Sequence, residues 1–248
     1  MFASRNHVDF DKISAMFKME DVSPKTQLHL KNVYGNLAAC TAICALGMYI
    51  NAYTILSGMF FQFAFLISMA YLMSKVSNVY EDEKTRLGYL WALAFCMGFL
   101  VGPLMHHLAE FEPSILINAV FCTTVCFASF TAMALFTKRR SMLFLGGIIS
   151  SLVSCLFWYR TITWMFGYSR YGMGHMNMVY LMCSLFMACL YIIYDTQMII
   201  EKAERGDKDV PSHTMTLFMD LFDLFIKIVQ LLMKLSEDDK KKKNKRRN

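Results

Sequence analysis

Charged residues are scarce in this chain. Asp, Glu, Lys and Arg make up 18% of its 248 residues, whereas soluble domains carry about 25%. The charges are also clustered, and between the clusters lie apolar stretches of roughly 20 residues, the length at which a helix crosses a bilayer. This shortage excludes an ordinary soluble domain and predicts an all-α polytopic membrane protein.

Three further signals, which would indicate secretion, glycosylation or a disulfide framework, are missing. The first thirty residues contain no apolar core, so we expect no cleavable signal peptide. No Asn-x-Ser/Thr acceptor occurs, so no glycosylated lumenal loop is indicated. The eight cysteines all lie in apolar runs without neighbouring His or acidic ligands, which favours buried free thiols over disulfides or a soft-metal site.

The apolar stretches divide the chain into three parts. Residues 1–29 form a polar N-terminal segment, residues 30–235 a bundle of membrane helices, and residues 236–248 a polybasic tail that we expect to be disordered. We predict six transmembrane helices surrounding a central seventh helix, which is either spanning or re-entrant. The expected spans are 32–50, 53–73, 87–108, 114–136, 141–159 and 176–200, and the last apolar segment is 215–235.

The distribution of basic residues predicts the orientation. Lys and Arg gather in the N-terminal segment, in the loops at 75–86, 138–140 and 202–208, and in the tail. Such loops face the cytosol in most membrane proteins. Six crossings put all of these segments on the cytosolic side, whereas a seventh full crossing carries the tail to the other side. The segment 215–235 is long enough to cross, so a re-entrant last helix and a seventh span both remain open.

Acidic residues inside apolar runs are the main functional signal. Asp195 lies near the cytosolic end of the sixth span, and Asp220 and Asp223 lie three residues apart on one face of the last segment. If these helices pack antiparallel, Asp195 approaches Asp220 or Asp223. Two neighbouring carboxylates in a low dielectric share a proton and also offer oxygen ligands to a hard cation. The alternative is that Asp195 caps a helix end and that the other two face water.

Basic and imidazole groups extend this candidate site. Arg86 or Lys84, at the start of the third span, can serve as counter-charge and latch for the aspartates. His213 lies at the entrance to the last helix, where its ring can hydrogen-bond. His106 closes the third span near the lumenal surface and can titrate at roughly pH 6–7, although interfacial histidines are common.

Several stretches together resemble the Bax inhibitor-1 family, also called the transmembrane Bax inhibitor motif family. They are Glu83–Gly88, Val101–Pro103, Pro113–Leu116, Arg139–Gly147, Asp195–Asp207, and His213 with Leu217–Asp220 and the lysine tail. The resemblance covers nearly the whole chain. It implies a helix bundle around a central last helix in the endoplasmic reticulum membrane, with the N-terminus and the C-terminal tail in the cytosol.

The resemblance also implies a pH-sensitive calcium leak that suppresses programmed cell death. The family's paired aspartates fall on Asp195 and Asp220 and its basic gate residue on Arg86. Asp223 matches no general position, and relatives often carry a glutamate where this chain has His106. On this view no cofactor is needed, and Ca²⁺ is the transported ion, bound transiently by the paired aspartates. The expected partners are the lipid bilayer, Bcl-2-family or other membrane proteins and, at the basic tail, anionic lipid, but no nucleic acid.

Two other functions remain open. A non-conducting regulator binds other membrane proteins through its spans or its tail. An intramembrane aspartyl protease uses Asp195 and Asp220 to activate water, but presenilin-type enzymes carry Gly-x-Gly-Asp around the second aspartate, and this chain reads Leu217-Phe218-Met219-Asp220 there. We therefore expect no enzyme activity.

Overall fold

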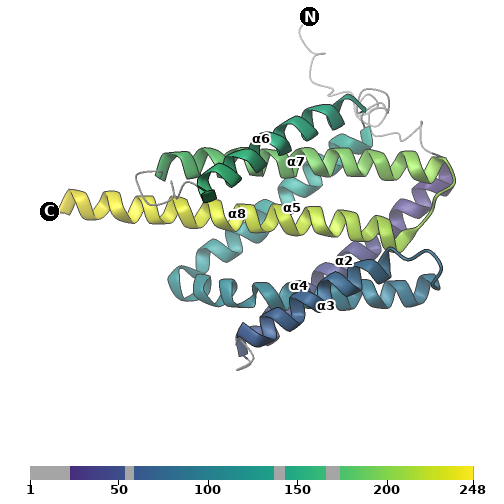
Figure 1. Ribbon diagram of the computed structural model, residues 1–248, viewed down its shortest axis with the longest axis horizontal. Helices are drawn as coiled ribbons and strands as arrows, with labels where there is room; N and C mark the ends of the chain where they lie inside the picture. Colours follow the sequence, from purple (N-terminus) through teal and green to yellow (C-terminus); the bar gives the residue numbers. More distant parts are fainter. Residues whose placement is uncertain (1–22, 54–58, 137–142, 166–173, 248) are drawn as a thin grey trace, which may run out of the picture.

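The computed structural model describes residues 23–53, 59–136, 143–165 and 174–247. These parts of the chain form seven α-helices and no strand (Figure 1). The helices are α2 (Pro24–Tyr53), α3 (Met59–Val76), α4 (Glu83–Phe111), α5 (Pro113–Phe136), α6 (Leu143–Met165), α7 (Gly174–Glu204) and α8 (Val210–Arg247). The all-helical fold predicted from the sequence is confirmed.

Five helices, α2, α4, α5, α6 and α7, are long and apolar enough to cross a membrane. In α3 the apolar stretch is shorter, and in α8 the charged residues Asp220, Asp223 and Lys227 interrupt the apolar run. A helix satisfies its backbone hydrogen bonds internally, which a lipid environment requires. The chain is therefore a multi-pass membrane protein, as its composition predicts.

Helix α8 has the widest set of neighbours in the bundle. It packs against α2, α3, α4, α5 and α7, whereas α6 packs mainly against α7 (Figure 1). The small residue Gly146 lets α6 lie against the ring of Tyr194 on α7. The predicted ring of six helices around a central seventh is therefore not confirmed, because α6 packs mainly against α7.

The most extensive helix contact joins α2 and α4, and two glycines make it possible. A Cβ atom at Gly98 of α4 would collide with the carbonyl oxygen of Cys44 on α2. A Cβ atom at Gly47 of α2 would lie 2.5 Å from the carbonyl oxygen of Phe95 on α4. Small residues allow the backbones of membrane helices to approach closely, so α2 and α4 form a tightly packed pair beside α8.

Helix α8 runs as one continuous helix along the bundle. Its start lies beside α4, where Arg86 contacts Asp209. Further along, Ser236 donates a hydrogen bond of 2.6 Å to Glu112 in the α4–α5 turn. The stretch from 210 to 236 is roughly 39 Å long at 1.5 Å per residue, and the hydrocarbon core of a bilayer is about 30 Å thick. Of the two alternatives for this segment, the structure shows the continuous helix, since the chain does not turn back between residues 210 and 247.

The basic tail continues α8 as far as Arg247, so the predicted disorder of this segment is wrong. Lys240 lies 3.5 Å from Glu112, and the Ser236 hydrogen bond, with help from Lys240, lowers the pKa of the Glu112 carboxyl. Helix α2 begins at the other end of the bundle, where the backbone N–H of Ser23 donates to Glu204 over 2.8 Å. The start of α2 and the basic tail thus lie at opposite ends of the bundle (Figure 1), and the predicted placing of both in the cytosol stays a prediction.

Candidate functional site

The aspartate pair expected from the sequence forms between α7 and α8. These helices are neighbours joined by the short link 205–209, and their antiparallel packing brings Asp195 of α7 to Asp220 of α8. The two carboxyl groups are within hydrogen-bonding reach of each other. A hydrogen bond between two carboxyl groups requires a proton on one of them. This arrangement therefore allows the two carboxyl groups to share a proton.

The surroundings of the pair are largely apolar. One turn away on each helix, Ile192 of α7 and Leu217 and Leu224 of α8 are fully buried. The Oδ2 atom of Asp220 is also buried, and it has no hydrogen-bond partner among the described residues. An unsatisfied buried polar atom costs free energy, and such atoms in native structures are often found where function needs them.

Asp223 does not join the pair. Its carboxylate forms an ion pair with Lys227 one turn along α8, the usual i,i+4 arrangement on a helix surface, and its side chain is 50% exposed. Asp223 and Lys227 act on Asp220 only through their charge. Of the two α8 aspartates that the sequence left as candidates, the structure therefore selects Asp220.

Arg86 is not the counter-charge of the aspartate pair in this structure. Its guanidinium, only 5% exposed, donates to the Oδ2 atom of Asp209 over 2.6 Å, and its Nε donates to the carbonyl oxygen of Val76 over 2.7 Å. Asp209 and Asp220 are separated by roughly 16 Å along α8. The predicted contact of Arg86 with the pair is thus corrected to an ion pair that joins the start of α4 to the start of α8.

Asp209 was missed in the sequence, although its position carries a signal. It directly precedes α8, and its Oδ1 atom accepts a hydrogen bond of 3.4 Å from the backbone N–H of Ser212, as a helix N-cap does. A proline follows at 211, and proline is typical of a first helical turn. Lys84, the other predicted latch residue, is exposed and takes no part in this contact.

His213 forms a separate polar contact at the start of α8. Its Nδ1 atom lies 2.9 Å from Nε2 of His29 on α2, with the two rings nearly perpendicular, and both residues are buried. One facing nitrogen donates its N–H and the other accepts it. The expected hydrogen bond of His213 is confirmed, whereas its partner His29 was missed because it lies in the segment assigned to the polar N-terminal part.

A stable metal site is not built by the part of the chain that the structure describes. It contains no group of three or more His, Cys, Asp or Glu side chains that could hold a metal ion. Ca²⁺ takes about six to eight oxygen ligands, so a cation at Asp195 and Asp220 needs water for most of its coordination. His106 does not belong to this site. Its side chain is exposed at the other end of α4, 3.6 Å from Glu110.

Comparison with known proteins gives one family along nearly the whole chain. Residues 26–237 match the family described as "Inhibitor of apoptosis-promoting Bax1". The chain is similar to a probable Bax inhibitor 1 of Paralichthys olivaceus, with 37% identity over 240 residues, 96% of this chain and 98% of the relative. It is similar to Bax inhibitor 1 of Homo sapiens, with 37% identity over 96% of this chain and 97% of the relative. It is also similar to Bax inhibitor 1 of Arabidopsis thaliana, with 37% identity over 92% of this chain and 89% of the relative.

Proposed function

The chain belongs to the Bax inhibitor-1 family, and from this premise we propose that it is a calcium leak channel of the endoplasmic reticulum membrane that suppresses programmed cell death. The observation that carries the proposal is the contact of the Asp195 and Asp220 carboxyl groups between α7 and α8. We propose that this pair is the proton sensor of the gate. In this proposal calcium is the transported ion and no cofactor takes part.

The chemistry of the pair supports a pH-dependent gate. With one shared proton, the carboxyl groups attract each other and hold α7 against α8. Without that proton, two negative charges face each other in a low dielectric, where repulsion is much stronger than in water. A second proton instead removes the charge that strengthens the hydrogen bond. Each change alters the packing of α7 on α8, so the path that a cation takes between them depends on pH.

Calcium flux from liposomes that contain the purified protein tests this proposal. We expect wild-type flux to depend on pH. Asp195→Asn and Asp220→Asn keep the shape of the side chain and can still donate an N–H to the remaining carboxylate, but they cannot exchange the shared proton. Flux through either variant is therefore expected to stay at one level across the pH range. Asp239→Asn is the matched control, because Asp239 is an exposed aspartate on the same helix, 19 residues from Asp220, and this variant should keep the wild-type profile.

The possible results separate the candidate functions. If the pH dependence survives in both pair variants, the pair is not the sensor. If flux is absent at every pH while cell-death suppression persists, the protein is a non-conducting regulator that acts by binding Bcl-2-family or other membrane proteins. Cleavage of a membrane substrate that both variants lose would indicate an intramembrane aspartyl protease.

We also propose an orientation for the bundle. The end that carries Arg86, Lys202, Lys208 and the start of α2 is rich in basic residues, which favours the cytosolic side. The turn between α4 and α5 lacks Lys and Arg, and its Glu110 and Glu112 suit the lumenal side. Because Lys240 of the tail lies 3.5 Å from Glu112 in that turn, this orientation places the tail on the lumenal side, opposite the start of α2.

A further inference from the structure

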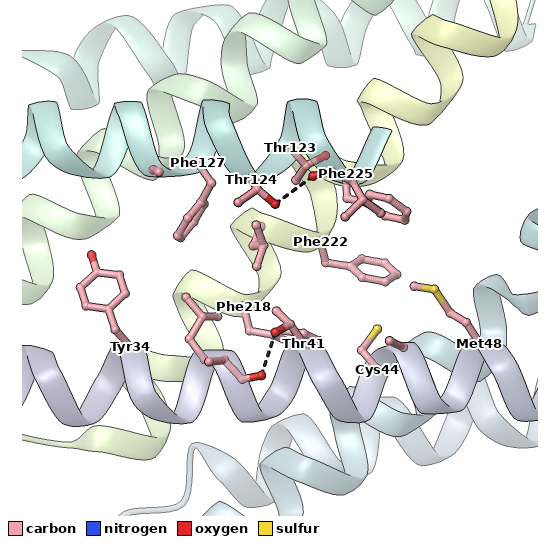
Figure 2. A pocket seen from close by; sticks show the side chains of 16 residues that line it. Tyr34, Thr41, Cys44, Met48, Thr123, Thr124, Phe127, Phe218, Phe222 and Phe225 are labelled. Carbon is pink, nitrogen blue, oxygen red and sulfur yellow. Dashed lines mark hydrogen bonds between the residues drawn. The ribbon is translucent and has the colours of Figure 1, made fainter. Parts of the chain in front are cut away.

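A cavity of about 470 Å³ opens between α2 and α5, and α8 forms its floor (Figure 2). One face of each helix lines it, namely Tyr34, Leu37, Ala38, Thr41, Cys44, Ala45 and Met48 of α2, Val120, Thr123, Thr124, Phe127 and Ala128 of α5, and Phe218, Leu221, Phe222 and Phe225 of α8. Binding sites for small molecules have volumes of about 300–1,000 Å³, so this cavity is large enough to hold a ligand. Neither the aspartate pair nor Arg86 lines it, and it is therefore distinct from the site described above.

The walls of the cavity are apolar. Three phenylalanine rings of α8 lie along its floor (Figure 2). Thr41, Thr123 and Thr124 also line it, but each hydroxyl donates its hydrogen to a carbonyl oxygen of its own helix. These side chains therefore present mainly methyl groups to the cavity. Such a surface suits hydrocarbon and not an ion or a water cluster, which needs several polar partners.

The cavity has the position and length that fit a lipid chain. Helices α2 and α5 both qualify as membrane spans, and each packs on α8 but not extensively on the other. The gap between them therefore faces the hydrocarbon of the bilayer. Along α2 the cavity extends from Tyr34 to Met48, which is roughly 21 Å of helix, a large part of a hydrocarbon core about 30 Å thick.

Polar groups mark one end of the cavity. The Tyr34 hydroxyl stands there (Figure 2), facing the hydroxyls of Thr131 on α5 and Thr196 on α7. All three oxygens are buried, and none has a hydrogen bond of normal geometry to a described residue. Lys31 lies one turn nearer the start of α2, on the same face as Tyr34, and it is exposed. A cation therefore lies one helical turn beyond this end of the apolar cavity.

We propose that this cavity binds one acyl chain of a membrane glycerophospholipid, with the lipid phosphate at Lys31, beyond the Tyr34 end of the cavity. The hydrocarbon fills the gap between α2 and α5, and the ammonium group of Lys31 attracts the phosphate. The lipid thereby lies against the same helix, α8, that carries Asp220. This inference goes beyond ion conduction and does not depend on it.

Photo-crosslinking tests the acyl-chain site. The purified full-length protein is placed in nanodiscs that contain a phosphatidylcholine with a diazirine in one acyl chain, and adducts are mapped by mass spectrometry. Ala45→Phe places a ring in the cavity, because Ala45 lines it. Ala42→Phe is the matched control, since Ala42 is exposed on the same helix outside the cavity. We expect adducts to concentrate on the lining residues and to fall roughly tenfold in Ala45→Phe, the effect of losing about 1.4 kcal/mol of binding, but not in Ala42→Phe.

A second pair of variants tests the head-group contact. Lys31→Gln should reduce the labelling of the cavity by the phospholipid, whereas Lys25→Gln, an exposed lysine nearer the helix start, should not. Thermal unfolding of all four variants in detergent checks that they remain folded.

Two results would overturn the proposal. One is labelling that spreads evenly over the lipid-facing helices and is equal in the Ala45→Phe and Ala42→Phe variants, because the cavity is then ordinary lipid-facing surface. The other is crosslinking of a second protein chain at the lining residues in place of lipid, which makes this face a protein interface. Equal labelling of the Lys31→Gln and Lys25→Gln variants would remove the phosphate contact.

Discussion

At the scale of single residues, buried polar contacts join α8 and the residue that precedes it to three other helices. Arg86 and Asp209 connect it to α4, His29 and His213 connect it to α2, and the aspartate pair connects it to α7. Apolar contacts tolerate many rotations of a helix, whereas a hydrogen bond requires one partner at one place. These three contacts therefore fix the rotation of α8 in the bundle.

The histidine contact gives a prediction for stability. Replacing His29 with alanine leaves the Nδ1 atom of His213 buried without its partner, so we expect the protein to lose about 1–3 kcal/mol of stability. Thermal unfolding in detergent measures this loss. His107→Ala is the control, because His107 is exposed and its removal should change little. Equal melting temperatures for the two variants would show that the His29 contact contributes nothing.

The sequence predicted one of these contacts and missed two. The approach of Asp195 to the last helix was predictable, because an acid in an apolar run needs a polar partner, but the residues alone left Asp220 and Asp223 open and only the family resemblance named Asp220. The partner of Arg86 was not predictable, because the polar link after α7 offers several acids and only the folded chain selects Asp209. The contact of His29 was not predicted, because its neighbours Thr26 and Lys31 are polar and indicate a segment outside the bundle.

At the scale of helices, the α2–α4 contact depends on glycine. Gly98→Ala places a Cβ against the backbone of Cys44, so the two helices must move apart. Gly88→Ala on the same helix meets no atom within 4 Å. Alanine is a better helix former than glycine by about 1 kcal/mol, so we expect Gly88→Ala to keep or raise the melting temperature in detergent and Gly98→Ala to lower it. The prediction fails if both variants melt at the same temperature.

The existence of the helices was easier to predict than their ends. The apolar runs predicted where the helices of the bundle lie. They underestimated the lengths of α2 and α8, because both helices extend into polar sequence. Helix α2 begins at Pro24, eight residues before the predicted span at 32, because Thr26 and His29 point into the protein and not into lipid. Helix α8 continues through the lysine tail, where Ser236 and Lys240 hold it to Glu112.

At the scale of the whole molecule, the path of α8 predicts the side on which the tail lies. Because α8 runs from the α7–α8 link to the α4–α5 turn, epitopes placed before Met1 and after Asn248 should lie on opposite sides of the membrane. Antibody access after permeabilisation of the plasma membrane alone measures this. A third epitope beside Gly206 is the internal control and should behave like the one before Met1. If all three are accessible together, α8 does not cross in the cell.

The distribution of charge along the sequence could not have decided on which side of the membrane the tail lies. Basic residues assign a side to each loop, but they favour a returning α8 only through the tail itself. The course of α8 along the bundle depends on contacts that no local pattern contains, such as the one between Ser236 and Glu112, which lie 124 residues apart. The multi-pass class was therefore predictable from composition, and the course of the last helix was not.

Helix α8 also constrains how the protein is made. Asp and Lys near the middle of a helix each oppose insertion into the bilayer by about 2.5–3.5 kcal/mol, and α8 carries Asp220, Asp223 and Lys227 in its apolar part. It follows the other described helices in the chain, so it is synthesised after them. The translocon is therefore expected to release the earlier helices into the membrane first, and α8 joins them by docking. Until that step, the polar faces of α2, α4 and α7 lack their partners and are exposed to chaperones and to the quality-control machinery.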